Sequence, residues 1–160
     1  MRGRRDEVDE TTRVSTGATA SADAAKAQRI DHVGVLVRDI AAAARYFVER
    51  FGMSVATVSD LADGSARLAY LDAGDTTLQL VQPLRDGPLA KQLAERGEGL
   101  HHVCFLVDGL EAALAELPGE VDRVGAIYMG GRQCRVVFTS FRPSGVLVEL
   151  TEPPREQGPA

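Results

Sequence analysis

The stretches HVGVLV, residues 32–37, and HVCFLV, residues 102–107, nearly repeat each other and decide the fold. The chain has three histidines, and one of them opens each stretch. The offset of 70 residues between His32 and His102 also superimposes LQLVQP (78–83) on VELTEP (148–153) without a gap. Self-similarity at one fixed offset indicates a repeated structural unit. The sequence therefore predicts an internal duplication.

Each copy predicts the order strand, helix, strand, strand, strand. Alternating apolar residues between turn residues indicate the strands. Asp39 and Gly52 have the residue types of a helix N-cap and a helix stop. A connecting helix over 85–98 is predicted to be capped by Asp86. The predicted strands are 29–37, 53–61, 65–73, 76–83, 99–107, 121–129, 133–141 and 145–153, and the other two helices are 40–52 and 108–117.

This order predicts an α+β fold of two tandem βαβββ modules. We expect a single domain over 29–153, which consists of module one (29–84), the connecting helix (85–98) and module two (99–153). Residues 1–28 are polar and lack hydrophobic periodicity, so they are predicted to form a disordered tail. A short C-terminal tail is predicted at 154–160.

Charge and composition exclude several classes of partner. The net charge of the 160 residues is −5, and residues 1–28 contribute five basic and five acidic groups, so the acidity belongs to the folded part. An acidic surface argues against nucleic acid and anionic membranes as partners. No apolar run approaches 18 residues, and the two cysteines, Cys104 and Cys134, do not form a disulfide framework. We therefore expect a cytoplasmic protein.

The same offset brings together residues with metal-ligand chemistry. Gln79 pairs with Glu149, and each follows the histidine of its module by 47 residues. If the modules pack about a pseudo-two-fold axis, His32, Gln79, His102 and Glu149 can converge. Two imidazoles, an amide oxygen and a carboxylate suit Co, Mn, Ni, Fe, Zn or Mg. His102, not His101, is the partner of His32, so His101→Ala is expected to leave the metal in place.

The chain resembles the vicinal oxygen chelate superfamily, which includes glyoxalase I, extradiol dioxygenases and bleomycin-resistance proteins. IDHVGVLVRDI (30–40), LVQPLRDGPLAKQLAERGEGLHHVCFLVDGLEAAL (80–114) and GVLVELTEP (145–153) are similar to the methylmalonyl-CoA epimerase branch. The resemblance implies a cup-shaped mixed sheet around a divalent ion, with ligands at His32, Gln79, His102 and Glu149. It also implies a homodimer and a small-molecule substrate, an acyl-CoA thioester.

By this resemblance, the ion chelates two carbonyl oxygens of a 2-methylmalonyl thioester, and two acid/base groups exchange the α-proton on opposite faces. One of these roles falls on Glu149. The other, a glutamate in the epimerases, falls on Leu68 in this chain. Tyr70 would share a strand face with Leu68, so Glu149 and Tyr70 are the candidate catalytic residues. Cys104 is interpreted as a buried packing thiol.

Other functions stay open at this point. The epimerase is the leading interpretation, and the loss of the carboxylate at Leu68 leaves as an alternative a related isomerase, lyase or cyclase of a biosynthetic pathway with another substrate. Some members of the superfamily only sequester a drug, although a complete ligand set favours an enzyme, and glyoxalase I activity ranks lower. Candidate partners for the phosphates of an acyl-CoA, with surface solvation as the alternative, are Lys91, Arg96, Arg132 and Arg135.

Overall fold

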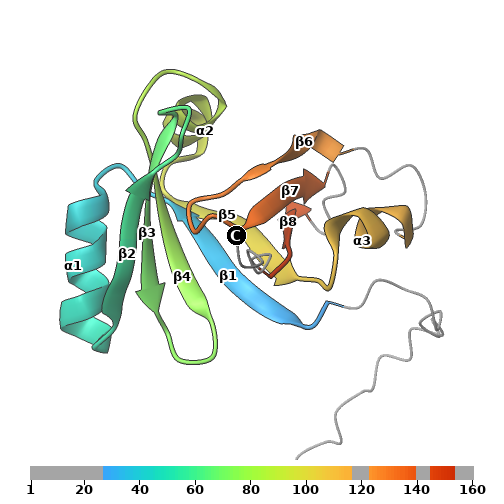
Figure 1. Ribbon diagram of the computed structural model, residues 1–160. Helices are drawn as coiled ribbons and strands as arrows, with labels where there is room; N and C mark the ends of the chain where they lie inside the picture. Colours follow the sequence, from blue (N-terminus) through green and yellow to red (C-terminus); the bar gives the residue numbers. More distant parts are fainter. Residues whose placement is uncertain (1–26, 117–122, 140–144, 154–160) are drawn as a thin grey trace, which may run out of the picture.

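The computed structural model describes residues 27–116, 123–139 and 145–153. Its helices and strands follow the predicted order twice (Figure 1). The first half contains β1 (Arg29–Leu36), α1 (Ile40–Phe51), β2 (Ser54–Asp60), β3 (Ala66–Asp72) and β4 (Thr77–Pro83). After α2 (Pro88–Arg96), the second half contains β5 (Gly99–Leu106), α3 (Leu110–Glu116), β6 (Arg123–Met129), β7 (Arg135–Thr139) and β8 (Leu147–Thr151).

The strands form one mixed sheet in the order β2-β3-β4-β1-β5-β8-β7-β6. β1 is parallel to β4 in the first half, as β5 is to β8 in the second. The antiparallel pair β1–β5 joins the halves. The sheet curls into a cup with α1 against β2–β4 and α3 beside β7 (Figure 1). The predicted α+β class with two βαβββ halves is therefore confirmed.

Helix α1 is capped as predicted, whereas α2 is not. The Asp39 carboxylate accepts hydrogen bonds from the backbone N–H groups of Ala41 and Ala42, at 2.9 and 3.0 Å, and Gly52 ends the helix in the left-handed conformation. The cap position of α2 is occupied by Gly87, and no side chain caps this helix. The prediction that Asp86 is the cap was wrong, because extended backbone at Gly87 moves the start of the helix past it.

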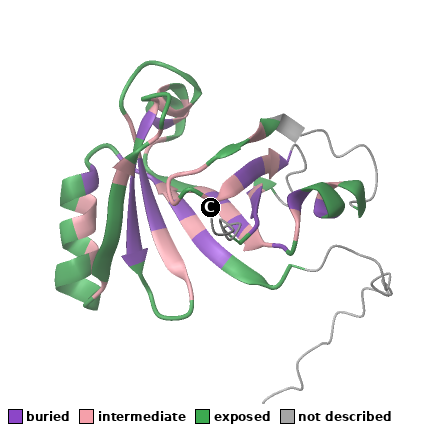
Figure 2. Cartoon of the chain, in the orientation of Figure 1, coloured by how far each residue is buried: buried purple, intermediate pink, exposed green. Residues whose placement is uncertain are grey.

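Strand β3 is buried on both faces, as Figure 2 shows by its purple colour. Ala69 and Leu71 pack on α1 with Leu80 and other residues of the outer cluster. Leu68 and Tyr70 point to the opposite, concave face. This arrangement explains why β3 reads as a nearly continuous apolar run, and it places Leu68 and Tyr70 at the wall of the cup.

Several predictions fall on segments outside the described residues: most of the 1–28 tail, the C-terminal tail, the helix end at 117 and the strand ends at 121–122 and 140–141. Within the described part of the chain, no helix has both the length and the apolar character needed to cross a membrane. Both cysteines are free, as expected.

The two aspartates that the sequence assigns as caps provide a matched pair of variants. Asp39→Ala removes the two cap hydrogen bonds of α1 and is expected to lower the free energy of unfolding by about 1 kcal/mol. Asp86→Ala is expected to change it by less than about 0.5 kcal/mol. Urea denaturation of both variants measures the difference. Equal losses would contradict the cap assignment.

Candidate metal centre

Two bulges at the β1–β5 junction shape the site. Ile30 pairs with Phe105 and His32 with Cys104, which leaves Asp31 as an extra residue in β1. Farther along β1, Gly34 pairs with His102 and Val35 pairs with Leu100. This pairing leaves His101 as an extra residue in β5. A bulge re-aims side chains beside it. The two extra residues are again 70 positions apart, so the junction keeps the symmetry of the duplication.

Three of the four predicted ligands converge at the centre of the concave face. His32 Nε2 lies 3.1 Å from both His102 Nε2 and Glu149 Oε2, and the latter two atoms are 3.4 Å apart. All three residues are at least 96% buried. Bonds of about 2.1 Å to one ion place neighbouring ligand atoms about 3.0–3.4 Å apart in octahedral or tetrahedral geometry. The spacing and chemistry of these groups therefore fit a divalent cation.

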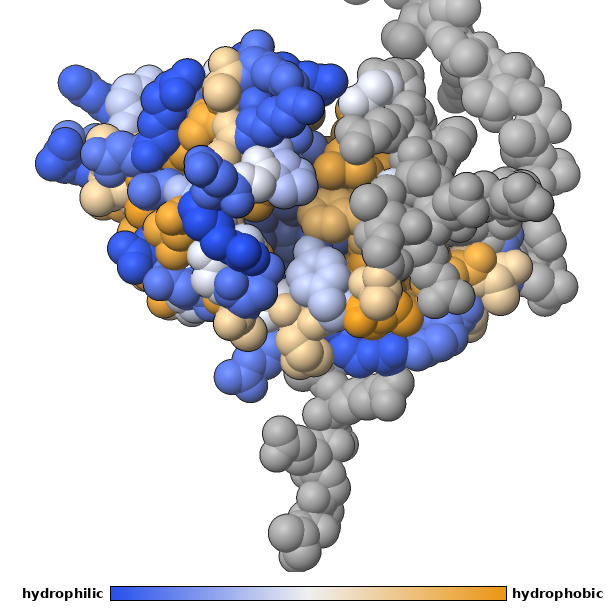
Figure 3. All heavy atoms as spheres, turned by 90° about the horizontal axis from the view of Figure 1, so that it is seen from above, coloured by the Kyte–Doolittle hydropathy of each residue, from blue (hydrophilic) through white to orange (hydrophobic). Residues whose placement is uncertain are grey.

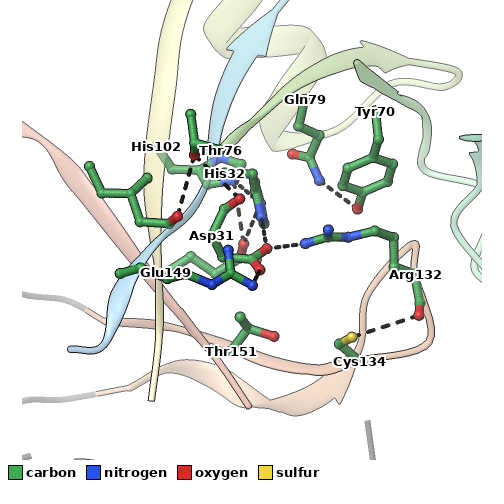
Figure 4. A network of polar contacts seen from close by, with 12 residues as sticks. Asp31, His32, Tyr70, Thr76, Gln79, His102, Arg132, Cys134, Glu149 and Thr151 are labelled. Atoms are coloured by element: carbon green, nitrogen blue, oxygen red, sulfur yellow. Dashed lines mark hydrogen bonds and ion pairs between the residues drawn. The ribbon is translucent and has the colours of Figure 1, made fainter. Parts of the chain in front are cut away.

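Gln79 on β4 presents the fourth oxygen. Its amide nitrogen donates a hydrogen bond of 2.7 Å to the hydroxyl of Tyr70. This bond orients the amide, and its carbonyl oxygen lies on the side of His32 and His102 (Figure 4). Both Gln79 and Tyr70 are buried. The amide oxygen is thus available as a ligand, while the nitrogen is held by the phenol.

Each histidine is held through its other ring nitrogen by the residue before it. Asp31 Oδ2 lies 2.8 Å from His32 Nδ1, and His101 Nδ1 lies 2.7 Å from His102 Nδ1. Such contacts fix the ring orientation and direct Nε2 to a metal. The role of His101 was missed, because simple strand alternation turns neighbouring side chains to opposite faces. The offset of 70 between Asp31 and His101 is the signal that could have revealed it.

Charges at the site stabilise one another. Burial raises the pKa of Glu149, but hydrogen bonds from His102 and His32 outweigh it and lower the pKa to about 2. Burial lowers the pKa of His32, but hydrogen bonds to Asp31 and Glu149 outweigh it and raise the pKa above its ordinary value. Without a cation, the site therefore favours protonated His32 and ionised Glu149.

Small residues lie opposite both histidines. A β-carbon at Gly34 would lie 2.1 Å from Cε1 and 2.3 Å from Nδ1 of His102, so only glycine leaves room for this ring. Cys104 takes the equivalent position opposite His32 and is fully buried. Burial, together with the nearby Glu149 carboxylate, raises the pKa of its thiol. Cys104 therefore stays a neutral thiol and packs against the site.

The ligands line a cavity of about 70 Å³ whose other walls are largely apolar. This cavity adjoins an apolar hollow of about 480 Å³. Four residues line both spaces: Leu61, Leu89, Tyr128 and Phe138. Seen from above, a hollow lies near the centre of the molecular face, with apolar residues along one side (Figure 3). The small cavity therefore opens toward the hollow through these shared apolar residues. The remaining lining residues are Leu68, Tyr70, Val81, His101, Gly130, Gly131 and Val136.

Two tyrosines flank Glu149 and Gln79. Tyr128, which sequence reasoning missed, donates a hydrogen bond of 3.4 Å to Oε1 of Glu149 and stacks on Phe138. Burial raises the pKa of Tyr70 to about 12. Both phenols are therefore protonated at neutral pH and can act as proton donors. Tyr128 lies on β6, whose sequence carries no motif that distinguishes it from an ordinary strand.

Of the four basic residues considered for phosphate binding, three form ion pairs within the protein. Arg132 points inward to Asp31, and Arg135 forms ion pairs with Glu111 and Glu152. Lys91 lies on the exposed surface, 3.8 Å from Glu95. Arg132 therefore contacts Asp31 at the candidate metal centre and is only partly exposed.

Comparison with known proteins agrees with this architecture. Residues 31–138 match the Glyoxalase/Bleomycin resistance protein/Dioxygenase superfamily, and the chain belongs to this family, also called the vicinal oxygen chelate superfamily. The Bacillus subtilis protein YqjC is 32% identical over 81% of this chain and 95% of its own length. The human mitochondrial methylmalonyl-CoA epimerase is 30% identical over 78% of this chain and 73% of its own length.

Among solved structures, a Streptomyces coelicolor methylmalonyl-CoA epimerase variant in complex with 2-nitronate-propionyl-CoA superimposes with a TM-score of 0.71. It is 29% identical, and the match covers 79% of this chain and 98% of that protein. The resemblance predicted from the motifs is therefore confirmed, and the similarity extends over the whole two-module fold.

A substitution at Gly34 tests whether the ring of His102 must occupy its present position for a metal to bind. Gly34→Ala forces the ring of His102 away from the other ligands, so the affinity for Co²⁺ is expected to fall about tenfold or more. Gly109→Ala is the matched control, because a β-carbon there meets nothing within 4 Å. Calorimetric titration of both variants with Co²⁺ measures the affinities. Unchanged binding by the Gly34 variant would exclude His102 as a ligand.

The pKa shifts predict how the stability of the metal-free protein depends on pH. Stability from protonated His32 is fully present below its unfolded pKa, 6.5, and is lost as the pH rises through the raised folded value. Stability from ionised Glu149 is present above 4.5 and is lost as the pH falls toward about 2. Glu149 and His32 together therefore favour a maximum in the free energy of unfolding between about pH 4.5 and pH 6.5.

Urea denaturation in the presence of a chelator checks this expectation. The free energy of unfolding should fall above about pH 6.5, and His32→Gln should flatten that fall. Added Co²⁺ should restore stability at high pH, since a metal binds the unprotonated imidazole. An identical decline in the wild type and the variant would show that another group causes it.

Proposed function

We propose that the protein is a divalent-metal-dependent enzyme that stabilises an enolate, with methylmalonyl-CoA epimerase-like 1,1-proton transfer as the leading activity. The observation that carries the proposal is the convergence of His32, His102 and Glu149 beside the oriented amide of Gln79, at the wall of an apolar cavity. Relatives of this fold include methylmalonyl-CoA epimerases, one of which was solved with an acyl-CoA analogue. A divalent cation held by these residues would supply Lewis acidity to two chelating oxygens.

Glu149 is the proposed base. Its Oε2 lies among the ligand atoms, whereas Oε1 accepts the hydrogen bond of Tyr128 at the cavity wall. The lowered pKa keeps the carboxylate ionised at neutral pH, which is the form that accepts a proton. The cation and its neighbouring imidazoles would also hold this carboxylate in a fixed orientation. Glu149 would thus combine proton transfer with metal binding.

Tyr70 is the proposed second group. Leu68, which stands where the epimerases carry a glutamate, is buried and cannot exchange a proton. Tyr70 lies two residues farther along β3 on the same wall, and its hydroxyl accepts a hydrogen bond from Gln79. Its own proton is therefore free to be donated elsewhere. Its pKa of about 12 makes it a proton donor to the enolate carbon at neutral pH.

Leu68 also favours a second candidate, an isomerase, lyase or cyclase of a biosynthetic pathway. Such an enzyme would retain Glu149 and the metal ligands, but would act on another chelating substrate and need no second carboxylate. Both candidates bind a small molecule through oxygen atoms. We further propose, from the resemblance and not from any contact described above, that the protein is a cytoplasmic homodimer.

Proton exchange tests the leading activity. With Co²⁺ and (2R)- or (2S)-methylmalonyl-CoA in D₂O, we expect deuterium to enter the α-position with inversion, and His102→Ala to abolish this. Tyr70→Phe should slow inversion by about 10²–10⁴-fold. Tyr46→Phe is the matched control, since Tyr46 is an exposed residue of α1. Nuclear magnetic resonance of the α-proton follows the reaction against a metal-free sample.

The outcomes separate the candidates. Metal-dependent exchange with inversion would support the epimerase. Tightly bound metal without exchange would contradict it and favour the second candidate. Inversion at an unchanged rate in Tyr70→Phe would exclude Tyr70 as the proton donor.

A further inference from the structure

Arg132 reaches from the second half of the chain into the first. It lies in the turn between β6 and β7, and its side chain points toward Asp31 and Tyr70 (Figure 4). The guanidinium forms an ion pair with the Asp31 carboxylate, and its central carbon lies 4.8 Å from the centre of the Tyr70 ring. About two thirds of the Arg132 side chain is buried. These two contacts link one arginine to two different parts of the metal centre.

The turn that carries Arg132 is closely packed against the first half. A β-carbon at Gly131 would lie 2.5 Å from Cδ1 of Leu68 and 3.0 Å from the Tyr70 hydroxyl, so glycine is needed there. The Gly131 carbonyl accepts a hydrogen bond of 3.1 Å from the hydroxyl of Ser59 on β2. Within the turn, Gln133 donates its backbone N–H to the carbonyl of Gly130. The backbone that precedes Arg132 is therefore positioned by contacts from the opposite half.

The first contact of Arg132 acts on His32. The same oxygen of Asp31, Oδ2, forms the ion pair with the Arg132 guanidinium and the hydrogen bond with Nδ1 of His32, which is 2.8 Å away. Asp31 is 95% buried, and its contact with the Arg132 guanidinium helps to fix the direction of its carboxylate. Loss of the arginine would leave the carboxylate free to rotate, and a rotated carboxylate would release the ring of His32.

The second contact acts on Gln79. The Tyr70 hydroxyl accepts the amide nitrogen of Gln79 at 2.7 Å, so the position of the phenol determines which amide atom turns to the other ligands. A guanidinium over an aromatic face is attracted to it, and the attraction is larger when both groups are partly desolvated. The ring of Tyr70 therefore lies between Arg132 and a metal ligand.

We propose that Arg132 is a positioning residue that holds both ligands of the first half, His32 through Asp31 and Gln79 through Tyr70. The second half would thus contribute His102 and Glu149 directly, and would also orient the two ligands that it does not carry. The inference rests on the metal centre proposed above, but not on the identity of the substrate.

Arg29 provides a matched control. Its guanidinium lies 3.5 Å from the other carboxylate oxygen of Asp31, so it carries the same charge near the same residue. Its side chain is about half exposed, whereas the guanidinium over the Tyr70 ring is that of Arg132. Exposed ion pairs contribute little because solvent screens them. Arg29→Met therefore removes a charge near Asp31 without removing the contact to the Tyr70 ring.

Calorimetric titration of the full chain with Co²⁺, together with the visible spectrum of bound Co²⁺, tests the proposal. We expect Arg132→Met to weaken binding about 10–100-fold and to change the spectrum, and Arg29→Met to weaken it less than about threefold. Arg132→Lys keeps the charge but not the planar stacking, so an intermediate affinity is expected. In an Asp31→Asn background, Arg132→Met should lose part of its effect, because the two residues act through one contact.

Each result has a definite meaning. If the wild type binds Co²⁺ and Arg132→Met and Arg132→Lys bind it equally tightly with an unchanged spectrum, the positioning role is overturned and the metal centre stands, even if thermal stability falls. If the wild type itself binds no divalent cation, the proposed metal centre fails and this inference fails with it. Weaker binding confined to the Arg132 variants would support the proposal.

Discussion

The antiparallel pairing of β1 with β5 is the interaction on which the rest of the structure depends. It joins two four-stranded halves into one sheet, and it places His32 and His102 on neighbouring strands with their Nε2 atoms 3.1 Å apart. Glu149 and Gln79 then arrive on β8 and β4, the parallel neighbours of these central strands. Neither half alone brings more than two of the four groups together.

Periodicity and the repeat were enough to predict the strands and the residues that converge. A period of two assigns each strand face, and one offset relates equivalent positions in the two halves. His32 and His102 could be paired in this way without knowledge of any contact. The same reasoning placed Leu68 and Tyr70 on one face of β3, where the structure finds both at the cavity wall.

What the sequence could not predict lies where the backbone departs from regular geometry. The bulges turn Asp31 and His101 toward the rings that follow them, against strict alternation. Asp86 has the right residue type for a cap, but the extended backbone at Gly87 displaces it from the helix start. Arg132 was considered only as a partner for CoA phosphates or as a solvated surface residue, because the tight turn that directs it inward depends on contacts with the other half.

Fusion of the halves into one chain has an electrostatic consequence. Two identical copies of the first half, related by a two-fold axis, would supply two histidines and two glutamines, a set without charge. Two copies of the second half would supply two carboxylates and neutralise a divalent cation completely. The fused chain supplies one carboxylate among the four groups, Glu149, and so would leave a net charge of +1 at a divalent cation held there. That residual positive charge would suit a substrate whose chelating oxygens carry negative charge.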